Sequence, residues 1–163
     1  MTHQRRAWEE LTLGETRASR LRRVTPEEII TFARQYDPQW FHTDPAAARE
    51  SVFGEVVASG IHVLALWRQL DHEINADIDF VCGVGWEELR LLRAVRGGDT
   101  IRATSALIAL APSRSGRPRG SAVHRYSVEL ADGTPCLTFL STALVYTRAA
   151  QAARQPAANR AAP

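Results

Sequence analysis

Apolar residues recur at helical spacing in the first half of this chain and alternate with polar residues through most of the second half. From Ile29 to Tyr36 the apolar side chains fall on one face of a helix. Thr25 and Pro26 precede this face as an N-cap and a first helical residue, and Glu28 completes a capping box. The pattern therefore predicts a helix that begins after Thr25.

Proline marks where this first helix ends and where a shorter one begins. Pro38 disfavours helical geometry at Asp37, so we expect the helix to stop there. Asp44 and Pro45 repeat the cap-then-proline signal, and they predict a short helix that closes near Gly54.

A third and longer helix is predicted from the N-cap Ser59 to about Asn75. Its first half, residues 61–67, is apolar almost all round, which is typical of a helix enclosed by a sheet. Polar residues return from Arg68 onward, where we expect the helix to reach solvent.

Strand-like patterns occupy most of the remaining chain. An edge strand is predicted over residues 17–24, and a strand-like run starts at Ile78. Three more long strands are predicted over residues 100–110, 124–130 and 135–146. An Asp-Gly pair between the last two strands is a strong hairpin signal.

One strand, three helices and an antiparallel meander together predict an α+β fold. A sheet with one apolar face must bury it, and the apolar third helix is the element available to cover that face. An antiparallel sheet wrapped around one long helix is the hot-dog arrangement. We assign residues 1–147 to a single domain of this kind, and we expect residues 148–163, which lack apolar periodicity, to form a flexible C-terminal tail.

Composition and charge exclude several classes of function. The chain has 163 residues, enough for one domain with a full core, and a formal net charge of +2. This charge is too small to indicate a nucleic-acid partner, and no run of ~20 apolar residues predicts a membrane span. The N-terminus has no signal-peptide pattern, and Cys82 and Cys136 are isolated, so we expect a cytoplasmic protein with reduced thiols.

The candidate chemistry lies between the first and third helices. Asp37 and His42 are five residues apart in a proline-bounded loop, so both side chains can reach one proton-transfer site. Gly60, next to Ser59, opens the third helix, whose first amide groups have no partner within the helix. A carboxylate, an imidazole and free amides are the groups needed for acid–base chemistry on a carbonyl compound. Taken alone, the same residues are also common as plain helix ends and helix caps.

The segment Tyr-Asp-Pro-Gln-Trp-Phe-His-Thr-Asp-Pro, residues 36–45, resembles the signature of the MaoC-like dehydratase family, which includes (R)-specific enoyl-CoA hydratases. The resemblance continues into the predicted strands and covers nearly the whole chain. It implies that Asp37 and His42 are the catalytic pair. It also implies that the N–H group of Gly60, with Ser59 beside it, faces the thioester oxygen.

Two positions depart from that signature. Its asparagine is Gln39 in this chain and its proline is Trp40, while a proline occurs instead at Pro38. We therefore assign Gln39, Trp40 and Tyr36 only a supporting place around the catalytic pair.

The resemblance implies an acyl-thioester hydratase or dehydratase, a lyase that adds water reversibly to a 2-enoyl-CoA and gives a 3-hydroxyacyl-CoA. The CoA thioester is then the substrate, and no cofactor is expected. Leu64 and Trp67 are candidates either for the acyl pocket or for the ordinary core. The resemblance also implies a homodimer, because hot-dog sheets of this family pair edge to edge. Two alternatives remain open: an acyl-CoA thioesterase of the same fold, and a non-catalytic module that binds acyl thioesters.

Two further groups of residues offer side chains of the kinds found in binding sites. The acidic and histidine residues of the third helix match no metal-ligand pattern, so no metal site is predicted at His62, Asp71, His72 and Glu73. The loop before the predicted strand at residues 124–130 contains Arg114, Arg117 and Arg119. Guanidinium groups pair well with phosphates, so this loop could contact CoA; the alternative is an ordinary solvated surface loop.

Overall fold

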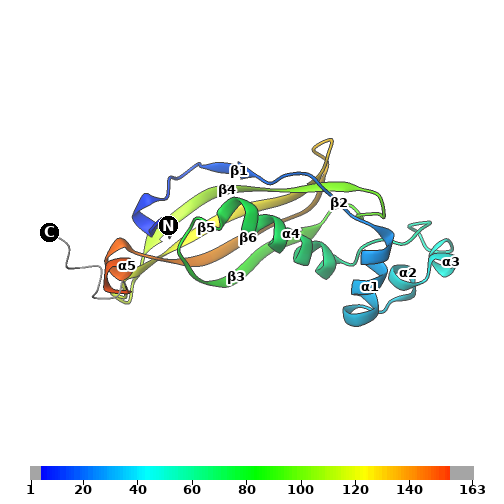
Figure 1. Ribbon diagram of the computed structural model, residues 1–163, viewed down its shortest axis with the longest axis horizontal. Coiled ribbons are helices and arrows are strands. Elements are labelled where there is room, and N and C mark those ends of the chain that lie inside the picture. Colours follow the sequence, from blue (N-terminus) through cyan, green and yellow to red (C-terminus); the bar gives the residue numbers. More distant parts are fainter. Residues whose placement is uncertain (1–4, 155–163) are drawn as a thin grey trace.

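The computed structural model describes residues 5–154 and arranges them as a curled antiparallel sheet around one long helix (Figure 1). The helices are η1 (Trp8–Glu10), α1 (Pro26–Tyr36), α2 (Trp40–Thr43), α3 (Pro45–Ala48), α4 (Gly60–Asn75) and α5 (Arg148–Arg154). The strands are β1 (Thr16–Ala18), β2 (Arg22–Arg23), β3 (Phe80–Leu91), β4 (Thr100–Pro112), β5 (Arg119–Leu130) and β6 (Pro135–Tyr146). The α+β hot-dog arrangement predicted from the sequence is confirmed. None of the helices within residues 5–154 is long and apolar enough to cross a bilayer.

The sheet follows the order β1-β4-β5-β6-β3, and β2 also pairs with β4. Every pairing between these strands is antiparallel. The edge strand predicted over residues 17–24 is in fact divided into β1 and β2. At the other edge lies β3, which pairs only with β6 among the described strands.

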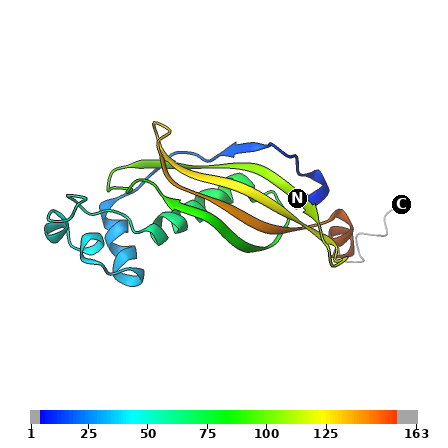
Figure 2. The same cartoon turned by 180° about the vertical axis from the view of Figure 1, so that it is seen from behind.

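Helix α4 lies inside the curl of the sheet, and both views show it crossing the concave face (Figures 1 and 2). Its apolar side chains, among them Leu66 and Leu70, are in the same buried core as Val128 and Phe139 of β5 and β6. Burying a side chain of this size contributes roughly 1.5–3 kcal/mol, so the contact of α4 with the sheet stabilises the fold by several kcal/mol. The all-round apolar character of the first half of α4 is explained by this enclosure.

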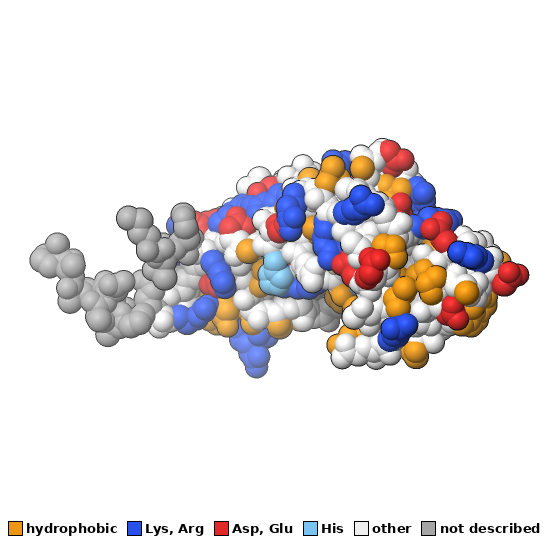
Figure 3. Space-filling model, turned by 45° about the vertical axis from the view of Figure 1, so that its right-hand side comes forward, with side chains coloured by type: hydrophobic (Ala, Val, Ile, Leu, Met, Phe, Trp, Pro, Cys, Tyr) orange, Lys and Arg blue, Asp and Glu red, His pale blue; other side chains and the backbone are white. Residues whose placement is uncertain are grey.

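Helices α1, α2 and α3 gather at one end of the molecule, and α5 lies at the opposite end (Figures 1 and 2). Helix α1 begins as predicted: the Thr25 hydroxyl accepts from the Glu28 amide, and the Glu28 carboxylate accepts from the Thr25 amide. The α1–α3 end exposes apolar side chains among charged ones (Figure 3). Tyr36, Trp40 and Val52 are exposed apolar residues of this part of the chain.

The prediction that residues 148–163 form a flexible tail is wrong for residues 148–154. Residues 148–154 form α5, in which Ala150 and Gln151 are buried. The Gln151 side-chain amide donates to the Arg5 carbonyl and to the Asp79 carboxylate, and Arg154 forms an ion pair with Asp79. These contacts join residues far apart in the sequence, so local periodicity did not indicate them. Residues 155–163 lie outside the described part of the chain.

Candidate active site

Asp37 follows the last residue of α1, where the sequence placed it. Its amide donates to the Ala33 carbonyl and closes the helix, and Pro38 prevents continuation. The side-chain amide of Gln39 donates to Asp37 Oδ1 at 3.2 Å. This hydrogen bond holds the carboxylate from one side and leaves Oδ2 for another partner.

His42 lies on the four-residue helix α2 and is buried. Its Nδ1 is 2.6 Å from the carbonyl oxygen of Val57, and because a carbonyl oxygen only accepts, Nδ1 must carry the proton. In the neutral ring Nε2 is then unprotonated, and it lies 3.8 Å from Asp37 Oδ2. That distance is longer than a hydrogen bond, so the two groups can both approach a third atom, such as a water oxygen.

The N-terminus of α4 presents free amides. The Ser59 hydroxyl accepts from the His62 amide, and the Ser59 carbonyl accepts from the Val63 amide. Within the described chain, the amides of Gly60 and Ile61 donate to no acceptor. A helix N-terminus carries partial positive charge, so these two N–H groups favour an oxygen on which negative charge develops.

Gly60 has a close neighbour on β3. A Cβ atom built on it would lie 2.7 Å from Cδ1 of Leu91, at the end of β3. A larger residue here would therefore displace the exposed Leu91 side chain from the start of α4.

One cavity of about 500 Å³ brings these groups together. Asp37, Gln39, His42 and Gly60 all contribute to its lining. The rest of its wall is largely apolar, and comes from α2, the α3–α4 segment, α4, the end of β3 and the start of β6: Phe41, Phe53, Val57, Ala58, Val63, Leu91, Leu92, Arg93, Ala94, Val95 and Cys136. Sequence reasoning missed this wall, because most of it is ordinary apolar sequence that reaches the cavity only through the fold.

Several predicted site residues lie elsewhere. Ser59 is buried as the cap of α4 and does not line the cavity, while Tyr36 and Trp40 are exposed on the surface. Leu64 and Trp67 belong to the core around α4, and neither lines this cavity.

The arginine loop lies at the wrong end of the molecule for a role in this cavity. Residues 113–118 connect β4 to β5, and the Pro118 carbonyl accepts from the amide of Thr147, next to α5. Helix α5 is at the opposite end from α1–α3 (Figure 1). The cavity's own arginine is Arg93, which the sequence analysis did not single out. The three arginines that the sequence suggested for CoA phosphates do not line the cavity: Arg114, Arg117 and Arg119.

Two ionisable groups near the cavity are held neutral by burial. Burial lowers the pKa of His62, whose ring stacks on Phe32 with centroids 4.4 Å apart. Burial also raises the pKa of the Cys136 thiol, so this cavity residue is a poor nucleophile at neutral pH.

No cluster of metal-ligating side chains occurs among residues 5–154. Asp71, one of the residues considered for a metal, instead accepts hydrogen bonds from Tyr126 and Asn75 and pairs with Arg68.

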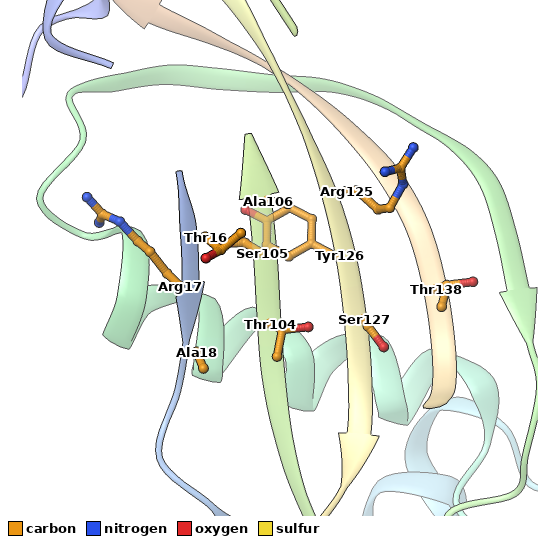
Figure 4. Close-up of a pocket in the computed structure, with 10 residues that line it drawn as sticks. All are labelled: Thr16, Arg17, Ala18, Thr104, Ser105, Ala106, Arg125, Tyr126, Ser127 and Thr138. Atoms are coloured by element: carbon orange, nitrogen blue, oxygen red, sulfur yellow. The ribbon is translucent and has the colours of Figure 1, made fainter. Parts of the chain in front are cut away.

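A separate surface hollow, of about 420 Å³, lies on the outer face of the sheet (Figure 4). Thr104, Ser127 and Thr138 are neighbours across β4, β5 and β6 and line it with hydroxyl groups. It contains neither Asp37 nor His42, so the cavity at the start of α4 is the candidate active site.

Comparison with known proteins identifies the family. The model of the family described as "MaoC like domain" matches residues 10–125. The chain belongs to the MaoC-like domain family.

Among the curated relatives of this MaoC-like chain is 3-hydroxyacyl-thioester dehydratase Z of Mycobacterium tuberculosis, 34% identical over 88 residues. That match covers 52% of this chain and 58% of the relative, so it spans little more than half of the relative's length. Among solved structures, the MaoC-like dehydratase from Rhodospirillum rubrum is 29% identical with a TM-score of 0.80, over 87% of this chain and 97% of that chain.

The R-hydratase PhaJ1 from Pseudomonas aeruginosa superposes with a TM-score of 0.70, over 87% of this chain and 86% of that chain. It is 20% identical, so this likeness shows the fold alone.

Proposed function

We propose that this MaoC-like chain is an acyl-thioester hydratase and dehydratase that interconverts a 2-enoyl-CoA and a 3-hydroxyacyl-CoA. The observation that carries the proposal is the single cavity lined by Asp37, His42 and Gly60. A carboxylate, an imidazole with a free Nε2 and the free amide of Gly60 at a helix N-terminus surround one space large enough for an enoyl thioester. The names of the M. tuberculosis and R. rubrum relatives support the same reaction class.

In the proposed hydration, a water oxygen lies between Asp37 Oδ2 and His42 Nε2 and attacks the β-carbon of the enoyl group. The electron pair of the double bond moves toward the thioester oxygen, and the Gly60 amide stabilises the charge there. The pair takes one proton from the water and delivers one to the α-carbon, so that H and OH are added overall. Dehydration is the reverse. No electrons are transferred to an acceptor, so the proposed reaction needs no cofactor.

Hydration of crotonyl-CoA, followed at the absorbance of the conjugated thioester, tests this proposal. Asp37→Asn and His42→Ala should each lower kcat by about a thousandfold, because acid–base groups of this kind contribute 10²–10⁴-fold. Asp132→Asn and His72→Ala make comparable changes at exposed positions outside the cavity and should leave the rate unchanged.

Three outcomes would reject it. Full activity in both cavity variants would remove the pair from the mechanism. Release of free thiol without hydration would indicate the thioesterase alternative. Binding of acyl-CoA without either reaction would indicate the non-catalytic module.

We further propose that two copies of this chain pair through β3. This strand is at the edge of the sheet and exposes several apolar side chains. Monomeric proteins rarely leave an apolar edge strand uncovered, so a second protein surface is expected to cover it. The exposed residues on or directly after it are Val84, Trp86, Leu91 and Leu92. A second copy that presents the same strand would cover both edges at once.

A further inference from the structure

A second cavity, of about 250 Å³, lies between the middle of α4 and the first half of β3. Trp67, Phe80 and Trp86 supply aromatic walls, and Asp71, His124, Tyr126 and Ser141 supply polar groups. It shares none of its lining residues with the candidate active site.

Small residues make the room for this second cavity. Gly83, Ala143 and Ser141 line it, and a Cβ atom on Gly83 would meet nothing within 4 Å. Arg68, Gly83 and Trp86 of its lining are exposed, so the cavity opens to solvent.

Two of its polar residues have no hydrogen-bond partner. His124 and Ser141 are direct neighbours across β5 and β6, and they are only 4% and 9% exposed. Neither side chain forms a hydrogen bond with any described residue. Their polar atoms still reach solvent, whereas the indole nitrogen of Trp67 is buried without a partner. Both side chains therefore keep hydrogen-bonding groups open to the cavity, and a ligand that enters it can bond to both.

The charges around the cavity cancel. The Asp71 carboxylate accepts from Tyr126 and Asn75, each at 2.8 Å, and its charge is balanced by Arg68. Burial lowers the pKa of His124, so its ring is neutral near pH 7 and has one nitrogen that donates and one that accepts. The cavity therefore suits a neutral group that can both donate and accept hydrogen bonds.

Helix α4 and strand β3 contribute to the walls of both cavities. Gly60, Val63 and Leu91 line the first, while Trp67, Asp71 and the start of β3 line the second. Eight helical residues separate Gly60 from Arg68, which is about 12 Å along the axis. The edge-to-face contact of Trp67 with Trp86, at 5.7 Å between centroids, is in the wall of the second cavity.

We propose that the second cavity binds the far end of the substrate's acyl group, and that this end carries a neutral hydroxyl or carbonyl group. This inference rests on the proposed function, since it takes an acyl thioester held at Gly60 as its starting point. The aromatic walls hold the carbon chain, and His124 and Ser141 bond to the polar end. An acyl chain as short as crotonyl does not reach the second cavity.

Calorimetry with two saturated thioesters, octanoyl-CoA and 8-hydroxyoctanoyl-CoA, tests the inference. Wild-type protein should bind the hydroxylated ester about tenfold more tightly, the ratio expected for one buried hydrogen bond. Ser141→Ala should reduce this preference while leaving the affinity for octanoyl-CoA unchanged. His124→Phe removes the other polar group, and the double variant should show no preference.

Ser127→Ala is the matched control. Ser127 is on the same strand as His124 and its hydroxyl also has no partner, but it lines the hollow on the outer face of the sheet (Figure 4). This variant should keep the tenfold preference. Equal affinity for the two esters in wild type, a full preference that survives in the double variant, or no binding of either ester would overturn the inference. Neither ester can be hydrated, so crotonyl-CoA hydration reports on the proposed function separately.

Discussion

At the scale of single residues, the candidate site depends on how two side chains are held. His42 is fixed by its hydrogen bond to the Val57 carbonyl, which determines which ring nitrogen is free. Asp37 is held by the side-chain amide of Gln39. Gln39 stands where the family signature has asparagine, and the longer amide still reaches the carboxylate. The departure from the signature is thus compatible with an ordered pair.

Gln39 and Trp40 are therefore expected to differ in importance although they are adjacent. Gln39→Ala removes a solvent-exposed hydrogen bond to the Asp37 carboxylate, which contributes about 0.5–1.5 kcal/mol, so kcat for crotonyl-CoA should fall by about threefold to tenfold. Trp40→Ala removes a side chain that is outside the cavity and 49% exposed, and it should change kcat by less than about twofold. Steady-state kinetics of the two variants check this, and equal losses would contradict the role given to Gln39.

At the scale of elements, α4 has two functions that depend on its first turn. Its apolar faces fill the curl of the sheet, and its N-terminus leaves the amides of Gly60, which lines the cavity, and Ile61 without an acceptor among the described residues. Ser59 satisfies the next amide, that of His62, and so determines where the helix begins. The Ser59 cap thus satisfies the amide of His62, while the amides of Gly60 and Ile61 remain without an acceptor among the described residues.

Substitution of Ser59 should affect stability through this cap. Ser59→Ala is expected to lower the free energy of unfolding by about 1 kcal/mol, and Ser59→Gly by only a few tenths. Thr25→Ala removes the cap of α1 and should cost about as much as Ser59→Ala. Urea denaturation measures all three. If Ser59→Gly were as destabilising as Ser59→Ala, the cap would not be the reason for serine here.

At the scale of the whole molecule, the core contains histidines that are kept neutral. Burial lowers the pKa of both His62 and His124, so the folded state binds fewer protons than the unfolded chain just below the ordinary histidine pKa of about 6.5. Stability rises with pH wherever the unfolded state binds more protons. It should therefore fall as the pH drops below about 6.5.

Replacing one of these histidines should reduce that dependence. Between pH 7 and pH 5 the free energy of unfolding of the wild type should decrease, and His62→Phe, which keeps a ring against Phe32, should show a smaller decrease. The exposed His72 provides the control, because His72→Phe should leave the slope unchanged. Glu15, whose pKa Arg6 lowers to about 2, loses its contribution only below the ordinary glutamate pKa of about 4.3 and does not interfere.

The proposed pairing through β3 is also tested on the whole molecule. Sedimentation at micromolar concentration should give a dimer for the wild type and a monomer for Val84→Arg, which places a charge on the exposed edge. Val52→Arg, at a more exposed apolar residue away from the sheet, should remain a dimer. A monomeric wild type would reject the pairing.

Much of the fold could be predicted because its signals are local. The capping box at Thr25, the proline after Asp37, the serine cap of α4 and the alternation in β5 and β6 each act within a few residues. The turn of α2 was missed, since four residues are too few for a periodic pattern and its helical form is stabilised by neighbours. Helix α5 was missed because its buried contacts are with Arg5 and Asp79, far away in the sequence.

By itself the sequence determined the order of the elements, the long apolar helix and the presence of an acid and an imidazole five residues apart. Only the tertiary structure decided which groups meet. It placed Leu91, Arg93 and Cys136 around Asp37 and His42, moved the arginine loop to the far end, and left His124 and Ser141 unpaired in a second cavity. The physical reason is that a helix start or a turn is fixed by neighbouring residues. A cavity is enclosed by side chains from separate elements, whose packing no local pattern specifies.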